Sequence, residues 1–156
     1  MPDHNYFMQY ALQQAQKAYQ KNEIPIGAVV VDGDGKIISR AYNRVEKEHS
    51  QACHAEVLAL AKAGKRLTNW RLTDCWLYVT LEPCGMCMCL AILSRLKGVV
   101  YGATSPVFGH QLDKYRPFWV NQSEKFDITL LPGIGAQESA DMLKRFFHNQ
   151  REKSRG

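Results

Sequence analysis

The sequence lacks the features that mark membrane, secreted and repetitive proteins. No apolar run approaches the roughly 18–20 residues that a membrane-spanning helix needs, and no internal repeat, low-complexity segment or linker interrupts the 156 residues. The first five residues contain neither a basic region nor the start of an apolar stretch, so they do not suggest a secretory signal. We therefore expect one globular domain over residues 1–156, located in the cytoplasm and without a membrane partner.

The composition also excludes chains that do not pack a core. Hydrophobic residues make up 46% of the sequence and charged residues 22%, which is close to the globular average and unlike disordered, collagen-like or coiled-coil chains. The five cysteines are an odd number, and disulfides are rare in the cytosol. Metal binding or thiol chemistry therefore explains the cysteines better than a disulfide framework does.

Positive charge is concentrated at the end of the chain. Lysine and arginine number 20 against 15 acidic residues, a net charge of +5, and the segment 144–156 alone has five basic side chains and one acidic, a net of +4. Such a segment suits contact with a polyanion, although a frayed, solubilising helix end has the same composition. The candidates for RNA contact are Arg145, Arg151, Lys153 and Arg155.

Hydrophobic periodicity predicts strands that alternate with helices. The expected helices cover residues 5–21, 52–65, 83–94 and 136–152, and the expected strands cover residues 26–31, 36–42, 76–81, 98–103 and 126–131. Residues 32–35, D-G-D-G, predict a hairpin turn, whereas residues 43–51 are expected to form a polar loop and residues 104–125 an irregular, aromatic segment. This order predicts an α/β fold with three layers, α-β-α, around a mixed sheet of about five strands that opens with a hairpin.

Two short motifs contain residues that bind zinc. His54-Ala55-Glu56 and Pro83-Cys84-Gly85-Met86-Cys87 each stand where a helix is expected to begin. Cys84 and Cys87 share one face of their helix because they are three residues apart. Two thiolates and one imidazole suit a single Zn²⁺ ion, and three protein ligands leave a fourth position for water, as catalytic zinc sites do. The motifs therefore predict a catalytic zinc site formed by His54, Cys84 and Cys87.

Glu56 is the candidate for proton transfer. His54 and Glu56 are two residues apart, about 200° around a helix axis, so both can face one metal ion only if it lies beyond the N-terminal end of the helix. There the positive end of the helix dipole would also favour a bound hydroxide. A carboxylate that lies beside the ligands without being one of them can take a proton from water and deliver it to the substrate.

The cysteines are also compatible with redox and structural roles. A lone C-x-x-C can be a redox pair, which has no need of an H-x-E motif. It can also be half of a structural zinc site, for which Cys53, Cys89 or His49 would supply the fourth ligand. Cys53, Cys75 and Cys89 can equally be small buried hydrophobic residues.

With these motifs the sequence resembles the zinc-dependent nucleobase deaminases, whose signature is H-x-E followed by P-C-x-x-C. Within that group it is most similar to the bacterial tRNA-specific adenosine deaminases. The stretches that carry this similarity are P-I-G-A-V-V-V (25–31), Y-N-R (42–44), H-A-E-V-L-A-L (54–60), W-R-L-T-D-C (70–75), L-Y-V-T-L-E-P-C-G-M-C (77–87), S-R-L-K-G-V-V-Y-G-A (94–103) and F-F-H-N-Q-R (146–151). The resemblance implies a cytidine-deaminase-like fold and a homodimer that converts adenosine to inosine at the wobble position of a tRNA anticodon.

The resemblance also implies roles for single residues. The predicted zinc ligands and the proton shuttle fall on the family's own, with one Zn²⁺ per chain. Asn43 falls on the asparagine that hydrogen-bonds the target base, although by itself it is typical of a turn, and Ile26 falls on an apolar residue that lines the base pocket. The C-terminal helix of such enzymes helps to hold the RNA, here expected to be a tRNA anticodon stem-loop, which agrees with the basic segment.

Two segments depart from the family pattern. Ser50-Gln51-Ala52-Cys53 stands where the family usually has D-P-T-A, and residues 104–113 replace a segment that usually contains an aspartate, a lysine and glycines. Ser105 falls where that aspartate would contact the RNA beside the target base, although it can also simply begin a turn before Pro106. The flanking sequence of the substrate, the tRNA concerned and the acceptance of DNA are therefore open.

Two other functions are compatible with the motifs. A deaminase of a free base, nucleoside or nucleotide, of the guanine or cytidine type, would use the same zinc chemistry, but a small substrate needs no basic C-terminal helix. An RNA-binding module with a structural zinc ion would need neither Glu56 nor an open coordination position.

Overall fold

A computed structural model of the chain describes residues 2–110 and 127–156. Within them the strands form one mixed sheet of five: β1 (Gly27–Val31), β2 (Ile37–Tyr42), β3 (Trp76–Leu81), β4 (Gly98–Ala103) and β5 (Thr129–Leu131). Their order is β2-β1-β3-β4-β5, with β1 antiparallel to both of its neighbours and β3, β4 and β5 parallel. The sheet thus opens with the predicted hairpin and continues through parallel strands.

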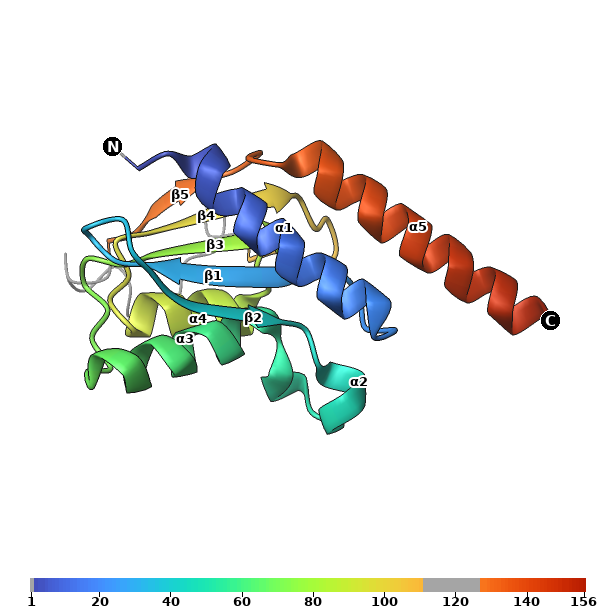
Figure 1. Cartoon of the computed structure of the whole chain (residues 1–156), viewed down its shortest axis with the longest axis horizontal. Coiled ribbons are helices and arrows are strands. Elements are labelled where there is room, and N and C mark those ends of the chain that lie inside the picture. The colour runs from blue at the N-terminus through green and yellow to red at the C-terminus, as the bar shows by residue number, and fades with distance from the viewer. Residues whose placement is uncertain (1, 111–126) are drawn as a thin grey trace.

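Helices cover both faces of the sheet (Figure 1). The helices are α1 (His4–Gln20), α2 (Val45–Glu48), α3 (Ala55–Leu67), α4 (Gly85–Leu93) and α5 (Ala136–Arg155). The first and last of them, α1 and α5, pack on one face, and α3 and α4 pack on the other. The three-layer α/β prediction is therefore confirmed. No helix in the described residues combines the length and the apolar character needed to cross a bilayer.

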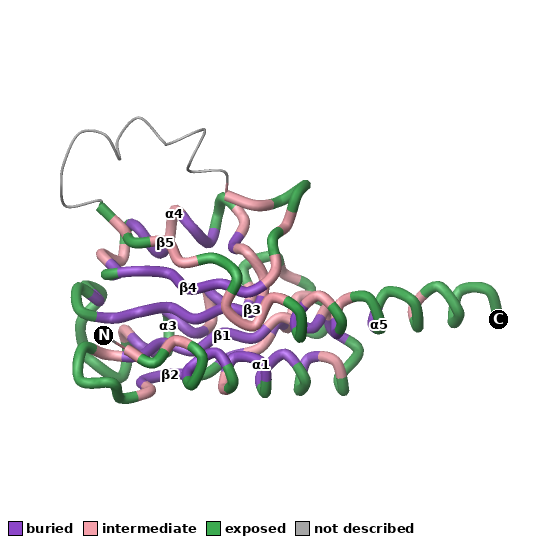
Figure 2. Tube along the Cα trace, turned by 90° about the horizontal axis from the view of Figure 1, so that it is seen from above, coloured by how far each residue is buried: buried purple, intermediate pink, exposed green. Residues whose placement is uncertain are grey.

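The central strand β1 shows why the sheet must be covered on both faces. All five of its residues are buried: Val30 packs into the core under α3 and α4, whereas Val29 and Val31 pack into the core under α1. Gly27 allows α1 to approach closely, because a Cβ at that position would lie 2.1 Å from the Ala11 carbonyl oxygen. Figure 2 shows the buried strands in the middle of the molecule and the exposed last turns of α5 extending beyond it.

Several boundaries differ from the predicted ones. The predicted polar loop at 43–51 contains the one-turn helix α2, and residues 51–53 form a 3₁₀ turn. For that reason α3 begins at Ala55, after an extended His54, and not at residue 52. The last strand is shorter than predicted, and residues 111–126, with most of the predicted aromatic segment, lie outside the described residues.

Candidate metal centre and active site

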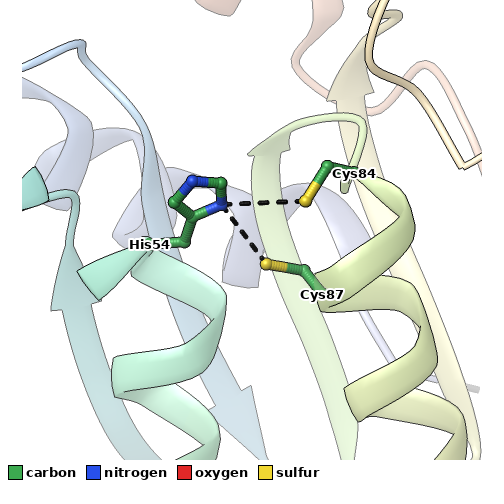
Figure 3. Close-up of side chains that lie close together, drawn as sticks. All are labelled: His54, Cys84 and Cys87. Carbon is green, nitrogen blue, oxygen red and sulfur yellow. Dashed lines mark hydrogen bonds between the residues drawn. The ribbon is translucent and has the colours of Figure 1, made fainter. Parts of the chain in front are cut away.

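The two zinc-binding motifs meet at one end of the sheet. His54 precedes α3 in an extended conformation, with ψ of 146°, and Cys84 precedes α4 in the same way, with ψ of 172°. The side chains of both residues leave the chain where the first helical turn begins, so the ligand atoms collect beyond the N-terminal ends of α3 and α4 (Figure 3). This is the arrangement that the spacing of His54 and Glu56 required.

The atoms of this group fit a zinc ion. His54 Nδ1 lies 3.4 Å from Cys87 Sγ and 3.8 Å from Cys84 Sγ, and all three atoms lie within 4.8 Å of one another. Tetrahedral zinc with bonds of about 2.0–2.3 Å holds its ligand atoms about 3.5 Å apart, so these donors can bind one ion with little movement. Among the described residues, neither His49, Cys53 nor Cys89 joins the group, which argues against a closed structural site.

Gln51 orients the imidazole. The Nε2 atom of His54 lies 2.9 Å from the Gln51 side-chain oxygen, so Nε2–H donates to that oxygen and Nδ1 faces the two sulfur atoms. Metal-binding histidines commonly make such a contact with their second nitrogen. Gln51 belongs to the segment that departs from the family pattern, and neither of the two zinc-binding motifs includes it.

The two thiols of the group ionise differently. Hydrogen bonds from Cys87 and His54 stabilise the Cys84 thiolate and lower the pKa of Cys84 to about 4. The hydrogen bond to Cys84, together with burial, raises the pKa of Cys87. The hydrogen bond with Cys84 also raises the pKa of His54. The thiolate form of Cys84 is therefore favoured at the place where a cation would bind.

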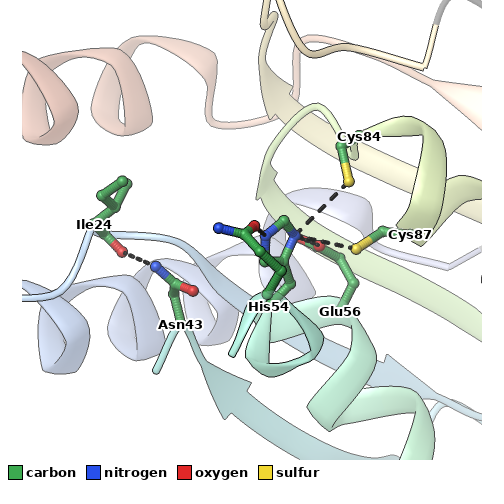
Figure 4. A network of polar contacts seen from close by, with 7 residues as sticks. Ile24, Asn43, His54, Glu56, Cys84 and Cys87 are labelled. Atoms are coloured by element: carbon green, nitrogen blue, oxygen red, sulfur yellow. Dashed lines mark hydrogen bonds and ion pairs between the residues drawn. The ribbon is translucent and has the colours of Figure 1, made fainter. Parts of the chain in front are cut away.

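Glu56 lies beside this group and is almost completely buried. Its side-chain Oε2 is 3.8 Å from His54 Nδ1, and the residue is 3% exposed (Figure 4). Burial raises the pKa of Glu56, because a low-dielectric environment disfavours the charged carboxylate. A carboxyl group whose pKa is raised in this way can hold and then release a proton, as general acid–base catalysis requires.

Asn43 presents an unused hydrogen-bond acceptor near the site. Its side-chain Nδ2 donates to the Ile24 carbonyl oxygen at 3.3 Å, while its buried Oδ1 has no partner within the described residues. In Figure 4 this oxygen is turned away from Ile24. Because buried polar atoms are nearly always paired, Oδ1 is free for a group that the protein itself does not supply. Ile26 is half-buried and packs against the core under α3 and α4.

Ser105 lies in a loop that Glu82 fastens to the metal centre. The Ser105 backbone N–H donates to Glu82 Oε1 at 2.9 Å, and His110 Nε2 lies 3.4 Å from Glu82 Oε2. The loop returns to the site at Gly109, which forms an isolated β-bridge with Cys84. A Cβ on Gly109 would lie 2.4 Å from the Glu82 carboxylate, so only glycine fits there.

Two carboxylates outside the zinc-binding motifs thus shape the surroundings of the site: Glu82, which is partly buried, and Glu23, which is buried. Glu82 directly precedes the Pro83-Cys84 motif, and this position was the only sequence signal for it. Glu23 is 3% exposed and accepts the backbone N–H groups of Glu46 and Lys47, each at 2.9 Å, so it holds the N-terminal end of α2. Nothing in the sequence near Glu23 indicates this contact, which joins segments more than 20 residues apart.

The basic residues predicted to contact RNA lie along α5 and not at the metal centre. All four side chains, Arg145, Arg151, Lys153 and Arg155, are exposed. The helix is held against α1 by the buried Phe146 and by contacts of Asn149 with Tyr19 and of Gln150 with Asn22. Its last turns therefore leave the body beside Asn22, directly after the end of α1.

Comparison with known proteins agrees with this geometry. Residues 1–103 match the family described as the cytidine and deoxycytidylate deaminase zinc-binding region. The chain belongs to this family of zinc-binding deaminases, and its fold and His/Cys/Cys group are those of that class.

Individual relatives indicate which kind of deaminase the chain resembles. The chain is 37% identical to the tRNA-specific adenosine deaminase of Streptococcus pyogenes serotype M1, over 99% of this chain and 90% of the relative. It is 40% identical to the tRNA-specific adenosine deaminase of Bacillus subtilis (strain 168), over 96% of this chain and 91% of the relative.

Solved structures of deaminases have a fold similar to that of this chain. One, from a study of A-to-I editing by tRNA:A34 deaminases at the wobble position, has a TM-score of 0.77 and 34% identity, covering 88% of this chain and 99% of that chain. The guanine deaminase of Nitrosomonas europaea has a TM-score of 0.79 and 25% identity, covering 94% of this chain and 85% of that chain. The fold is thus shared by deaminases that act on different substrates.

Proposed function

We propose that this protein is a zinc-dependent deaminase that converts adenosine to inosine in RNA, at the wobble position of a tRNA anticodon loop. The observation that carries the proposal is the buried Glu56 carboxyl group, 3.8 Å from the nitrogen of His54 that faces Cys84 and Cys87. The similarity to tRNA-specific adenosine deaminases over nearly the full chain supports the substrate.

In this proposal His54, Cys84 and Cys87 would hold one Zn²⁺ ion, and such an ion would supply a water molecule with a lowered pKa. Glu56 takes up one proton from the water and passes it to the ring nitrogen of adenine as the new C–O bond forms. It then transfers the proton of the new hydroxyl group to the departing amine as the C–N bond breaks. One water is consumed, and the products are inosine and ammonia. The raised pKa of Glu56 suits a group that must hold the proton between these transfers.

The target base is held by groups on the other side of the site. Because a base inside a stack cannot reach the metal centre, the adenine has to leave its stack and enter the protein. The unpaired Oδ1 of Asn43 supports its assignment as a hydrogen-bond acceptor for the base, and Ile26 provides an apolar wall. Ser105, at the loop that Glu82 holds beside Cys84, is assigned to the neighbouring nucleotide.

The basic end of α5 is assigned to the RNA backbone. Arg145, Arg151, Lys153 and Arg155 are exposed on a helix that extends beyond the body of the protein. A free base or nucleoside would be too small to use these charges. They therefore support an RNA substrate over the free guanine or cytidine that related deaminases would take.

The outer face of α4 supports a homodimer. Met86 and Leu93 are 46% and 47% exposed, and the half-buried Leu90 lies between them at helical spacing. Exposed apolar rows of this kind are typical of protein–protein contacts. A second copy of the chain is the proposed partner, residues 1–156 are proposed to form one deaminase domain, and the cytoplasm is the proposed location because tRNA is the substrate.

A substrate panel tests the proposal. Purified protein with one zinc ion per chain is incubated separately with a tRNA anticodon stem-loop, free adenosine, free guanine and cytidine, and each product is quantified. We expect inosine in the stem-loop and little product from the free compounds. Product from guanine or cytidine alone would replace the proposal with a free-base deaminase, and no product from any of them would favour an RNA-binding module.

A further inference from the structure

The edge strand β2 is lined by basic side chains. As the outermost strand, it has carbonyl groups that no other strand of the described sheet pairs with. Lys62 Nζ donates to the Arg40 carbonyl oxygen at 3.0 Å, and the Arg66 guanidinium donates to the Ile38 carbonyl oxygen. Both donors come from α3, so this helix covers the open edge with cationic groups. Charged side chains at an edge also oppose pairing with another strand.

These contacts set the positive charges in a row. Ile38 and Arg40 are two residues apart, so their outward carbonyl groups are separated by about 6.8 Å along an antiparallel strand. An ammonium has three donors and a guanidinium five, so Lys62 and Arg66 keep free donors after binding the backbone.

Further cations surround this row. The Arg40 guanidinium carbon lies 4.7 Å from the centre of the Tyr10 ring of α1, so its charge is held at the surface of the same edge. The pKa of Lys62 is lowered by partial burial and then by the positive charges of Arg44, Arg66 and Lys17. The four side chains Lys17, Arg40, Lys62 and Arg66, here called the basic edge, are exposed.

No acidic side chain forms an ion pair with the basic edge in the described part of the chain. Among the residues that the structure describes, the ion pairs join other groups, and none brings a carboxylate to one of these four side chains. Mutual repulsion between like charges costs free energy unless an anion neutralises it. The arrangement therefore favours a polyanionic partner over a purely structural role at the strand edge.

The basic edge is continuous with the candidate site. Arg44, whose charge acts on Lys62, directly follows Asn43, the candidate base-binding residue. The row of carbonyl-bound cations then runs along β2, away from Asn43. A nucleic acid with its target base beside Asn43 can therefore continue over Arg44 onto this surface.

We propose that the basic edge binds the phosphate backbone of the substrate tRNA outside the anticodon loop. This inference rests on the proposed function and gives it a second RNA contact, on a different element from α5. Each phosphate contact releases counterions, so it contributes to the salt dependence of binding. The surface then adds affinity for a whole tRNA, and little for an isolated loop.

The test variant is Lys17→Ala with Arg40→Ala, which removes two charges without touching the carbonyl contacts of α3. The matched control is Lys65→Ala with Lys97→Ala, because both lysines are exposed and neither is among the charges that act on Lys62. Dissociation constants are measured for a whole tRNA and for an unpaired oligonucleotide with the sequence of the anticodon loop. The salt concentration is varied from about 50 to 200 mM, a range over which phosphate contacts make affinity depend strongly on salt.

We expect the slope of log K against log salt for tRNA to fall in magnitude by about 1 to 2 in the test variant, since each duplex contact contributes about 0.9. The control and the loop oligonucleotide should keep the wild-type slope. An unchanged slope for tRNA in the test variant overturns the inference. The inference is also overturned if the wild-type protein and the control bind anionic lipid vesicles and the test variant does not. Absence of inosine with the wild-type protein overturns the proposed function instead, and the slopes still decide the inference.

Discussion

The strand β3 has a cysteine near each end, and the two thiols behave in opposite ways. Cys84, after β3, receives hydrogen bonds from Cys87 and His54, and its pKa falls to about 4. Cys75, before β3, is buried near the carboxylates of Asp32 and Asp74, and its pKa rises to about 11. The residue type is the same, so the surroundings alone decide which of these two thiols ionises more readily.

The shape of the surface does not reveal this difference. At the Cys75 end a hollow of about 600 Å³ is lined by polar residues that include Asp32, Arg71, Asp74 and Lys97. Within the described residues, however, no set of three histidine, cysteine or carboxylate groups at that end comes together at metal-binding distance. The donors lie at the opposite end of β3. In this fold the metal-binding donors lie at the N-terminal ends of helices, beside the carboxyl ends of β3 and β4.

Removing one thiol at each end is the strongest test of the comparison. Cys87→Ala should abolish zinc binding and activity and lower the melting temperature, because metal binding and folding are coupled. Cys75→Ala should keep one zinc per chain and cost only about 1 kcal/mol, or about 2–4 °C. Metal analysis and thermal unfolding of both variants measure this. Equal zinc loss in the two would mean that the assigned ligands are wrong.

Removing one carboxylate at each end separates catalysis from metal binding. Glu56→Ala should keep the fold and one zinc per chain but reduce kcat by about 10²- to 10⁴-fold, the usual contribution of a general acid–base group. Asp74→Ala, at the exposed rim of the other end, should leave both zinc and kcat unchanged. If Glu56→Ala lost its zinc, Glu56 would be a ligand and not a proton shuttle.

The sequence predicted the residues of the metal centre better than the residues around it. The reason is that the surrounding contacts join segments that are far apart in the sequence. His54, Glu56 and the pair Cys84 and Cys87 are ordered by helix starts and by three-residue spacing, which are local features. Glu82 reaches Ser105 across 23 residues, and no periodic pattern records such a contact.

The same reasoning explains the missed helix α2. Its four residues have no buried side chain, so no apolar pattern indicated a helix. The Glu23 carboxylate holds its N-terminal end from 23 residues away, which stabilises a turn that is too short to form alone. In contrast, β3 and β4 are strands with continuous apolar sequences, and their predicted bounds, 76–81 and 98–103, agree with the structure.

Removing positive charge tests whether α5 and the Cys75 end of β3 differ in their contribution to RNA binding. Replacing Arg151, Lys153 and Arg155 by alanine should weaken tRNA binding about tenfold at physiological salt and flatten its salt dependence, because phosphate contacts are lost. The matched control replaces Lys36, Arg71 and Lys97, three exposed cations at the Cys75 end, so the net charge changes equally. Binding measured at several salt concentrations distinguishes position from total charge, and identical slopes in the two triple variants would show α5 to be only a solubilising end.

The smallest expected effect concerns Ser105. A carboxylate beside the target accepts a hydrogen bond from a 2′-OH, which distinguishes RNA from DNA, whereas a neutral serine accepts a weaker one and does not repel phosphate. We therefore expect Ser105→Asp to widen the preference for RNA over the matching DNA hairpin by about 1 kcal/mol, roughly five- to tenfold in kcat/KM, mainly through a loss on DNA.

Two control variants separate the effect of the new negative charge from the effect of its position. Ser105→Asn has nearly the same shape as the aspartate variant without its charge, and Asn69→Asp places a carboxylate at the Cys75 end instead. The Ser105 backbone contact with Glu82 does not depend on the side chain, so the loop should keep its position in both Ser105 variants. Because a new carboxylate beside Glu82 must act through charge, only Ser105→Asp should change the ratio of kcat/KM for RNA and DNA. A ratio that stays at the wild-type value would show that Ser105 begins a turn before Pro106 and does not face the nucleic acid.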